Sequence, residues 1–270
     1  MPCPDSVIQR TGTSPNPGSF CDKISVMRYD NIIFSLYGTL VDISTDENDP
    51  KLWEGLAEFY SWQGAPIEGY RIRSVYDEEV RRLLSDARRK DPSLFHVDID
   101  ILKVFEAMYK RAGLTAKDYP IHETAEFFRE RSTRSVRLKD GALDLLDALE
   151  DSGAHIYLLC NGQSSFTRPE LRKLGIDDYF TATYFSSDYG MAKPEPAFYG
   201  KLLDNEGLSA EKTVMIGPDI DGDINGAKDA GIDSIFVFPG GEIPEGLKIP
   251  SVFVVKNGDL SEVASFLLEQ

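Results

Sequence analysis

Three acidic residues, Asp219, Asp221 and Asp223, follow closely on the apolar run TVMIG (213–217). Carboxylate oxygens are the hard ligands that Mg²⁺ prefers in proteins. Acidic side chains also gather at helix N-termini, where the helix dipole stabilises their negative charge. The segment therefore predicts either a metal site or the start of a helix, and we favour the metal site.

A second group of polar side chains stands in YDNIIFSLYGTLVDIST (29–45), where an apolar run breaks into a Gly-Thr turn. The serine hydroxyl of this stretch, at Ser35, is a weak nucleophile unless a positioned base removes its proton. The chain has three histidines that could act as a base, but none is expected near Ser35: His96, His122 and His155. We therefore predict that Ser35 cannot attack a substrate.

Five short apolar runs could position these residues: 31–36, 155–160, 182–187, 213–217 and 234–238. Most are separated by segments of helical period, such as KDGALDLLDALEDSG (139–153). Such strands alternating with helices predict an α/β fold, a doubly wound parallel sheet covered on both faces. Its ligand site is expected at the carboxyl ends of the strands. A sixth run, 251–255, predicts an edge strand before a C-terminal helix.

About a hundred residues without a strand signal separate the first two runs. Their amphipathic patterns predict an inserted four-helix cap domain, with helices near 51–63, 67–89, 98–112 and 121–134. Aromatic side chains at helical spacing are expected to pack this small bundle. The predicted division is a disordered tail over 1–27, a core domain over 28–44 and 136–270, and the cap over 45–135.

Four motifs occur in order along 29–260, and together they resemble the haloacid dehalogenase (HAD) superfamily. They are FSLYGTLVD, LLCN, AKPEPAFY and MIGPDIDGDINGAKDAGI, each at the end of a predicted strand or in the loop that follows. The four-helix insertion stands where the family's C1 cap belongs. The resemblance implies a Rossmann-like core that carries a hydrolase site.

In that superfamily a carboxylate of the first motif attacks phosphorus, or carbon in the dehalogenases, and forms a covalent aspartyl intermediate. Mg²⁺ and a lysine neutralise the phosphoryl charge. Matched to this chain, Ser35 occupies the nucleophile position, Tyr37 the acid/base position and Lys193 the position of the phosphate-binding lysine. Asp219 and Asp223 match the metal ligands. The remaining substrate-binding positions fall on Thr39, Cys160, Asn161 and Gly162, with cysteine replacing the usual Ser or Thr.

The resemblance thus implies a Mg²⁺-dependent phosphatase of a small phosphate ester, inactive or severely impaired because Ser35 replaces the nucleophile. The same change should weaken Mg²⁺ binding. Two other interpretations stay open. One is a natural pseudoenzyme that binds a phosphorylated ligand or a protein partner. The other is a relative of the metal-free 2-haloacid dehalogenases, where Tyr37 would be at home.

The composition narrows the partners and the compartment. With 45 acidic and 29 basic residues the net charge is −16, which argues against binding nucleic acid. No apolar run approaches the roughly 20 residues that span a bilayer. Three cysteines form no obvious framework, which favours a reducing compartment, the cytoplasm. The expected partner is a small phosphorylated molecule, and the expected assembly is a monomer or a homodimer.

Overall fold

The computed structural model describes residues 27–114, 120–240 and 248–269. All but the last residue of the predicted tail, 1–27, lies outside the described residues. Within the described part, no helix combines the length and the apolar character that a membrane crossing needs.

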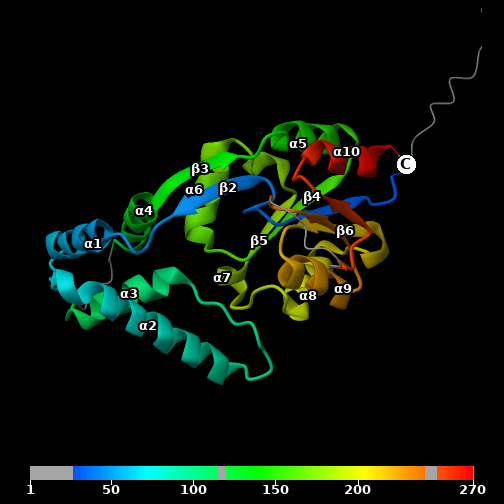
Figure 1. Ribbon diagram of the computed structural model, residues 1–270. Helices are drawn as coiled ribbons and strands as arrows, with labels where there is room; N and C mark the ends of the chain where they lie inside the picture. The colour runs from blue at the N-terminus through cyan, green and yellow to red at the C-terminus, as the bar shows by residue number, and fades with distance from the viewer. Residues whose placement is uncertain (1–26, 115–119, 241–247, 270) are drawn as a thin grey trace, which may run out of the picture.

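The core of the chain is a parallel six-stranded sheet (Figure 1). Across the sheet the strands are β5 (Ala182–Phe185), β4 (His155–Cys160), β1 (Asn31–Phe34), β6 (Thr213–Gly217), β7 (Asp233–Val237) and β8 (Phe253–Val255). The five apolar runs and the predicted edge strand are all confirmed. Because the chain builds outward from β1 in both directions, the carboxyl ends of β4, β1 and β6 meet at one edge.

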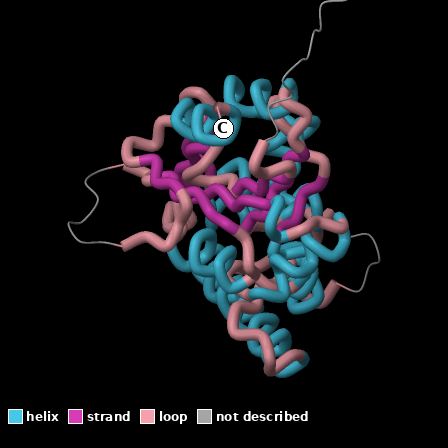
Figure 2. Tube along the Cα trace, turned by 90° about the vertical axis from the view of Figure 1, so that its right-hand side faces the viewer, coloured by secondary structure: helices cyan, strands magenta, loops and turns pink. Residues whose placement is uncertain are grey.

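Helices cover both faces of this sheet, and Figure 2 shows the strands as a layer between them. On β1, Ile32 and Phe34 face one cluster and Ile33 faces the other, as the alternation along a strand requires. The first cluster is closed by α5 (Ala142–Asp151), α6 (Ser164–Leu174) and α10 (Leu260–Leu268), and the second by α8 (Pro196–Glu206) and α9 (Gly226–Asp229). A short helix, α7 (Ser186–Tyr189), follows β5. The doubly wound α/β fold is therefore confirmed.

The insertion between β1 and β4 contains four helices, which we call the cap helices. They are α1 (Pro50–Trp62), α2 (Gly69–Lys90), α3 (Ile101–Arg111) and α4 (Ile121–Ser132). Their core is aromatic, as predicted: the rings of Tyr60 and Tyr109 stack at 4.2 Å between centroids, and Phe105 and Phe128 are fully buried.

The connection between the cap helices and the sheet differs from the sequence prediction, which placed no strand there. An antiparallel ribbon of β2 (Val41–Thr45) and β3 (Thr133–Leu138) carries the chain out and back, with Val41 opposite Leu138. Most of its residues are partly or fully exposed, so the strands lack the apolar run that marks the core strands. The ribbon straddles the boundaries proposed between 28–44, 45–135 and 136–270, and that division stays a prediction.

A tight turn at Gly38 directs the chain from β1 into the ribbon. Gly38 has φ +79°, which side chains other than hydrogen rarely tolerate, and a Cβ here would lie 3.1 Å from Pro218 Cγ. The turn therefore requires glycine for both its backbone conformation and its contact with the loop after β6.

We predict that Gly38→Ala lowers the free energy of unfolding by about 1–3 kcal/mol, because it adds backbone strain and a steric clash. Gly200→Ala is the matched control. Gly200 lies inside α8, and a Cβ there meets no atom within 4 Å. It should raise stability by about 0.5–1 kcal/mol through helix propensity. Urea denaturation of both variants measures the difference, and equal effects would contradict this account of the turn.

Candidate active site

The ammonium group of Lys193 is the centre of the predicted site. Its Nζ donates to Asp223 Oδ1 at 2.6 Å, to the carbonyl oxygen of Leu159 at 2.7 Å and to Ser35 Oγ at 3.1 Å. The side chains of Lys193 and Asp223 are only 3% and 1% exposed. The structure thus brings together the ends of β1, β4 and β6 around one buried cation.

This geometry bears on whether Lys193 could activate Ser35 as a base. An ammonium group has three N–H donors, and here each has an acceptor, whereas a neutral amine has only two N–H bonds. Lys193 therefore donates to Ser35 and has no lone pair with which to take the proton of the hydroxyl. The predicted inability of Ser35 to attack is consistent with these contacts.

The acidic segment after β6 caps a helical turn, one of the two roles that the sequence left open for it, and also pairs with Lys193. Asp223 is fully buried, pairs with Lys193 through Oδ1 and accepts from the Asp219 N–H through Oδ2 at 3.0 Å. Asp219 is exposed, and its carboxylate caps the π-helical turn Ile220–Asn225 by accepting from the Asp221 N–H at 3.0 Å. Gly217 makes room for this arrangement, since a Cβ there would lie 2.1 Å from Asp223 Oδ2.

The donors of the unchanged chain fit a Mg²⁺ site poorly. Both carboxylate oxygens of Asp223 already accept hydrogen bonds, and a hydroxyl stands at Ser35 where the family resemblance expects a carboxylate. Octahedral Mg²⁺ needs oxygen ligands that are free to turn toward it. Across the described ranges, no group of three or more His, Cys, Asp or Glu side chains is arranged to hold a metal.

Residues 160–162, predicted to bind substrate, are largely engaged with the protein itself. The side-chain amide of Asn161 clamps the backbone of Lys193, donating to its carbonyl at 3.0 Å and accepting from its N–H at 2.8 Å. The Gly162 N–H donates to Ser186 Oγ at 2.8 Å. Burial raises the pKa of the Cys160 thiol to about 11, with the charge of Lys193 only partly opposing it. Cys160 is therefore a neutral, packed thiol rather than a nucleophile.

Tyr37 lies at the same sheet edge, and its hydroxyl contacts a different set of side chains. It donates to Glu170 Oε2 at 2.6 Å and shares a 3.1 Å hydrogen bond with Thr167 Oγ1. Glu170 is also paired, through Oε1, with Arg129 Nε of α4 at 2.6 Å. Burial, reinforced by the charge of Glu170, raises the pKa of Tyr37 above its ordinary value. Tyr37 is thus held as a hydrogen-bond donor to Glu170, and its predicted catalytic role stays a prediction.

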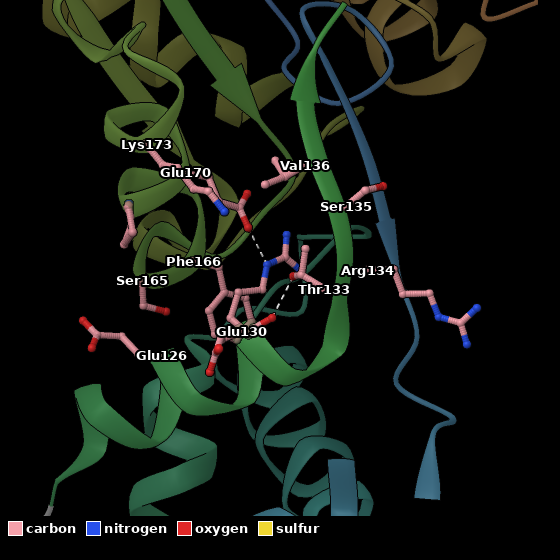
Figure 3. A pocket seen from close by; sticks show the side chains of 12 residues that line it. Glu126, Glu130, Thr133, Arg134, Ser135, Val136, Ser165, Phe166, Glu170 and Lys173 are labelled. Carbon is pink, nitrogen blue, oxygen red and sulfur yellow. Dashed lines mark hydrogen bonds and ion pairs between the residues drawn. The ribbon is translucent and has the colours of Figure 1, made fainter. Parts of the chain in front are cut away.

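Beyond this network lies a cavity of about 410 Å³ where α4, β3 and α6 meet (Figure 3). Glu170 reaches from α6 toward the cap helices there, and Phe166 lies beside it. The wall of the cavity is formed by residues of these three elements: Glu126, Arg129, Glu130, Thr133, Arg134, Ser135, Val136, Ser165, Phe166, Pro169, Glu170 and Lys173. The Arg129–Glu170 pair is therefore shared between this cavity and Tyr37.

Two further predictions concern the turn after β1 and the histidines. Thr39 is fully buried, and its hydroxyl has no hydrogen-bond partner among the described residues. The three histidines are exposed, and His155 pairs with Asn31 at the opposite end of the sheet. Among the described residues, the side chain that hydrogen-bonds to Ser35 is that of Lys193 and not of a histidine.

Sequence reasoning missed Arg129, Glu170 and Ser186. The one signal for Glu170 is its spacing in α6, where it shares the buried face with Phe166, Thr167 and Leu171. A buried carboxylate needs a partner. Its partners, Tyr37 and Arg129, are 133 and 41 residues away in the chain, so no local pattern could identify them.

A family model described as haloacid dehalogenase-like hydrolase matches residues 29–231. The chain belongs to this family. It is 27% identical over 215 residues to the pyrimidine 5'-nucleotidase PynA of Streptococcus pneumoniae, which covers 79% of this chain and 85% of PynA. The match to the family model confirms the resemblance that the four motifs carried.

Solved structures of HAD proteins share the fold. A 2-haloacid dehalogenase of Pseudomonas syringae pv. Tomato superposes with a TM-score of 0.60 at 22% identity, covering 87% of this chain and 97% of that one. The putative HAD-hydrolase YfnB of Bacillus subtilis, solved bound to magnesium, gives 0.50 at 24% identity, covering 89% and 99%. At these identities the likeness shows the fold alone.

We predict that Lys193→Met destabilises this HAD protein by about 3–5 kcal/mol, because it leaves the Asp223 carboxylate buried without its partner. Adding Asp223→Asn to Lys193→Met should recover part of that loss. The double variant should therefore lose less stability than the two single variants lose together. Lys201→Met, at an exposed position of α8, is the control and should change stability by less than about 0.5 kcal/mol. Additive single changes in urea denaturation would argue against the pairing.

Proposed function

We propose that this HAD-family hydrolase binds a small phosphorylated molecule at the carboxyl ends of β4, β1 and β6, and that it hydrolyses phosphate esters poorly or not at all. The observation that carries the proposal is the contact of Lys193 with Ser35. A buried cation lies where a phosphoryl group would be held, and the side chain at the nucleophile position receives a hydrogen bond from it.

The charge balance of the site does not exclude an anion. Lys193 and Asp223 neutralise one another, and the hydroxyl of Ser35 adds no further negative charge. A carboxylate at position 35 would repel a phosphate unless a metal compensated for it. The buried Thr39 hydroxyl, which lacks a partner in the described residues, is a donor that a ligand oxygen could satisfy.

Two other functions are outcomes of the same test. A pseudoenzyme would use the site to bind a phosphorylated ligand or a protein partner without turnover, and the departures at Ser35 and Cys160 support it. Dehalogenase chemistry would need the carboxylate that Ser35 replaces, so the structural likeness to a dehalogenase supports only the fold.

We predict that Ser35→Asp restores phosphatase turnover on a panel of small phosphate esters with Mg²⁺, by at least about a thousandfold over the chain as it stands. Removal of the attacking side chain commonly costs this much or more. The introduced carboxylate would stand next to Lys193 Nζ, which already contacts the side chain of Ser35. Ser35→Asn, similar in shape but unable to attack, is the control and should stay inactive.

The outcomes separate the three functions. Turnover by the unchanged chain would refute our account of Ser35. No turnover by Ser35→Asp, together with phosphate binding to the unchanged chain, would favour the pseudoenzyme. Chloride release from 2-chloropropionate by Ser35→Asp without Mg²⁺ would favour the dehalogenase.

We further propose that Mg²⁺ binds only weakly at Asp219 and Asp223 in this chain. Ser35→Asp supplies the missing carboxylate, so we predict that it tightens Mg²⁺ binding at least tenfold, measured by isothermal titration calorimetry. Asp223→Asn in the Ser35→Asp background should abolish the gain. An equal affinity of the unchanged chain and Ser35→Asp would contradict a weakened metal site.

A further inference from the structure

The loop of residues 91–100 connects the cap helices α2 and α3, yet it lies against the core (Figure 1). Its backbone pairs with the segment that precedes Lys193. The Asp98 N–H donates to the carbonyl of Gly190 at 3.1 Å, and the Ala192 N–H donates to the carbonyl of His96 at 2.8 Å. Val97 and Met191 form an antiparallel bridge between these two bonds. We call residues 91–100 the docking loop.

Glu195 adds a side-chain contact to this pairing. Its Oε2 accepts from the N–H groups of Phe95 at 3.0 Å and His96 at 3.2 Å, and the residue is only 8% exposed. Glu195 stands at the N-cap of α8, yet its side chain makes no capping bond there. A buried carboxylate is therefore used to hold the docking loop instead of its own helix.

The other end of the docking loop is held from the segment after β4. Gln163 donates through Nε2 to the Ile99 carbonyl at 2.9 Å and accepts through Oε1 from the Ile101 N–H at 2.8 Å. Ser186 Oγ donates to Asp98 Oδ2 at 2.6 Å while it accepts from the Gly162 N–H. The NH₂ group and the oxygen of the Gln163 side-chain amide thus both bind the backbone of the cap insertion.

These anchors lie in the two segments that position Lys193. Glu195 follows Lys193 by two residues, and Gln163 follows Asn161, whose side chain clamps the Lys193 backbone. The docking loop therefore buttresses the lysine segment from outside. The cap helices also reach the core through the ribbon of β2 and β3 and through the Arg129–Glu170 pair of α4 and α6. The docking loop adds a third contact that limits how far the cap helices can turn about the ribbon.

We propose that Glu195 and Gln163 are positioning residues that fasten the docking loop onto the segment carrying Lys193. The position of the cap helices and the position of Lys193 are then coupled. Opening the cap then breaks the contacts that hold Lys193 in register with Ser35. By linkage, an anion bound at Lys193 also stabilises the docked loop. This coupling to an anion rests on the proposed function, whereas the fastening itself does not.

Hydrogen exchange of the full chain, followed by mass spectrometry, tests the fastening. In Glu195→Ala we expect the amides of 95–98 to exchange at least tenfold faster, while those of β1 and β4 keep their rates. Glu195→Gln retains an acceptor oxygen, so its 95–98 amides should exchange at a rate between those of the unchanged chain and Glu195→Ala. Asp204→Ala, an exposed acid on the same helix, is the control and should match the unchanged chain. Unchanged exchange at 95–98 in Glu195→Ala would overturn the proposal.

Gln163→Ala tests the opposite anchor and covers the case in which Glu195→Ala does not fold. It should speed exchange at 99–101 while β1 and β4 stay protected, and no local change there would also overturn the proposal.

Titration with inorganic phosphate separates positioning from a purely structural role. We expect Glu195→Ala to lower the affinity for phosphate at least threefold and Glu195→Gln to restore most of that affinity. In the unchanged chain, bound phosphate should slow amide exchange at 95–98. Faster loop exchange with an unaltered phosphate affinity would refute the link to Lys193. Absence of phosphate binding to the unchanged chain would refute the proposed function, and the exchange rates would still decide the fastening.

Discussion

The buried ion pair of Lys193 and Asp223 is the constraint on which this end of the molecule depends. Two charges removed from water are tolerated only when every donor and acceptor has a partner. That requirement explains the glycine at 217, which leaves space for the carboxylate, and the two bonds by which Asn161 holds the lysine backbone. It also explains why the ammonium group of Lys193, after two other acceptors, still donates its third hydrogen bond to Ser35.

The residues that converge on this pair could be predicted from the sequence because each follows an apolar strand. Parallel strands bring their carboxyl ends together, so Ser35, Cys160 and Asp223 had to lie near one another once the strands were recognised. The second set of side chains around the site could not be predicted in this way. Glu170 and Arg129 meet Tyr37 only through the packing of α4 against α6, and their own segments read as ordinary amphipathic helices.

The fold shows the same limit. The central strands are buried on both faces and stand out as apolar runs. Most side chains of β2 and β3 are partly or fully exposed, and many of them are polar. Their stability comes from pairing with each other, a long-range property that a short window of sequence does not carry. The docking loop likewise has no helical or strand period in its sequence. Its structure is imposed by its contacts with Glu195 and Gln163 and by the strand-like pairing at Met191.

The ribbon also bears on how such a chain can fold. β1 and β4 are neighbours in the sheet, yet the whole helical insertion lies between them in the sequence. A β2–β3 pairing that forms first would bring the two ends of that insertion together ahead of the central strands. Most of the loop-closure entropy is then lost at the ribbon, and β1 and β4 search for each other as if joined by a short connection. A large insertion of this kind therefore adds little to the cost of assembling the sheet.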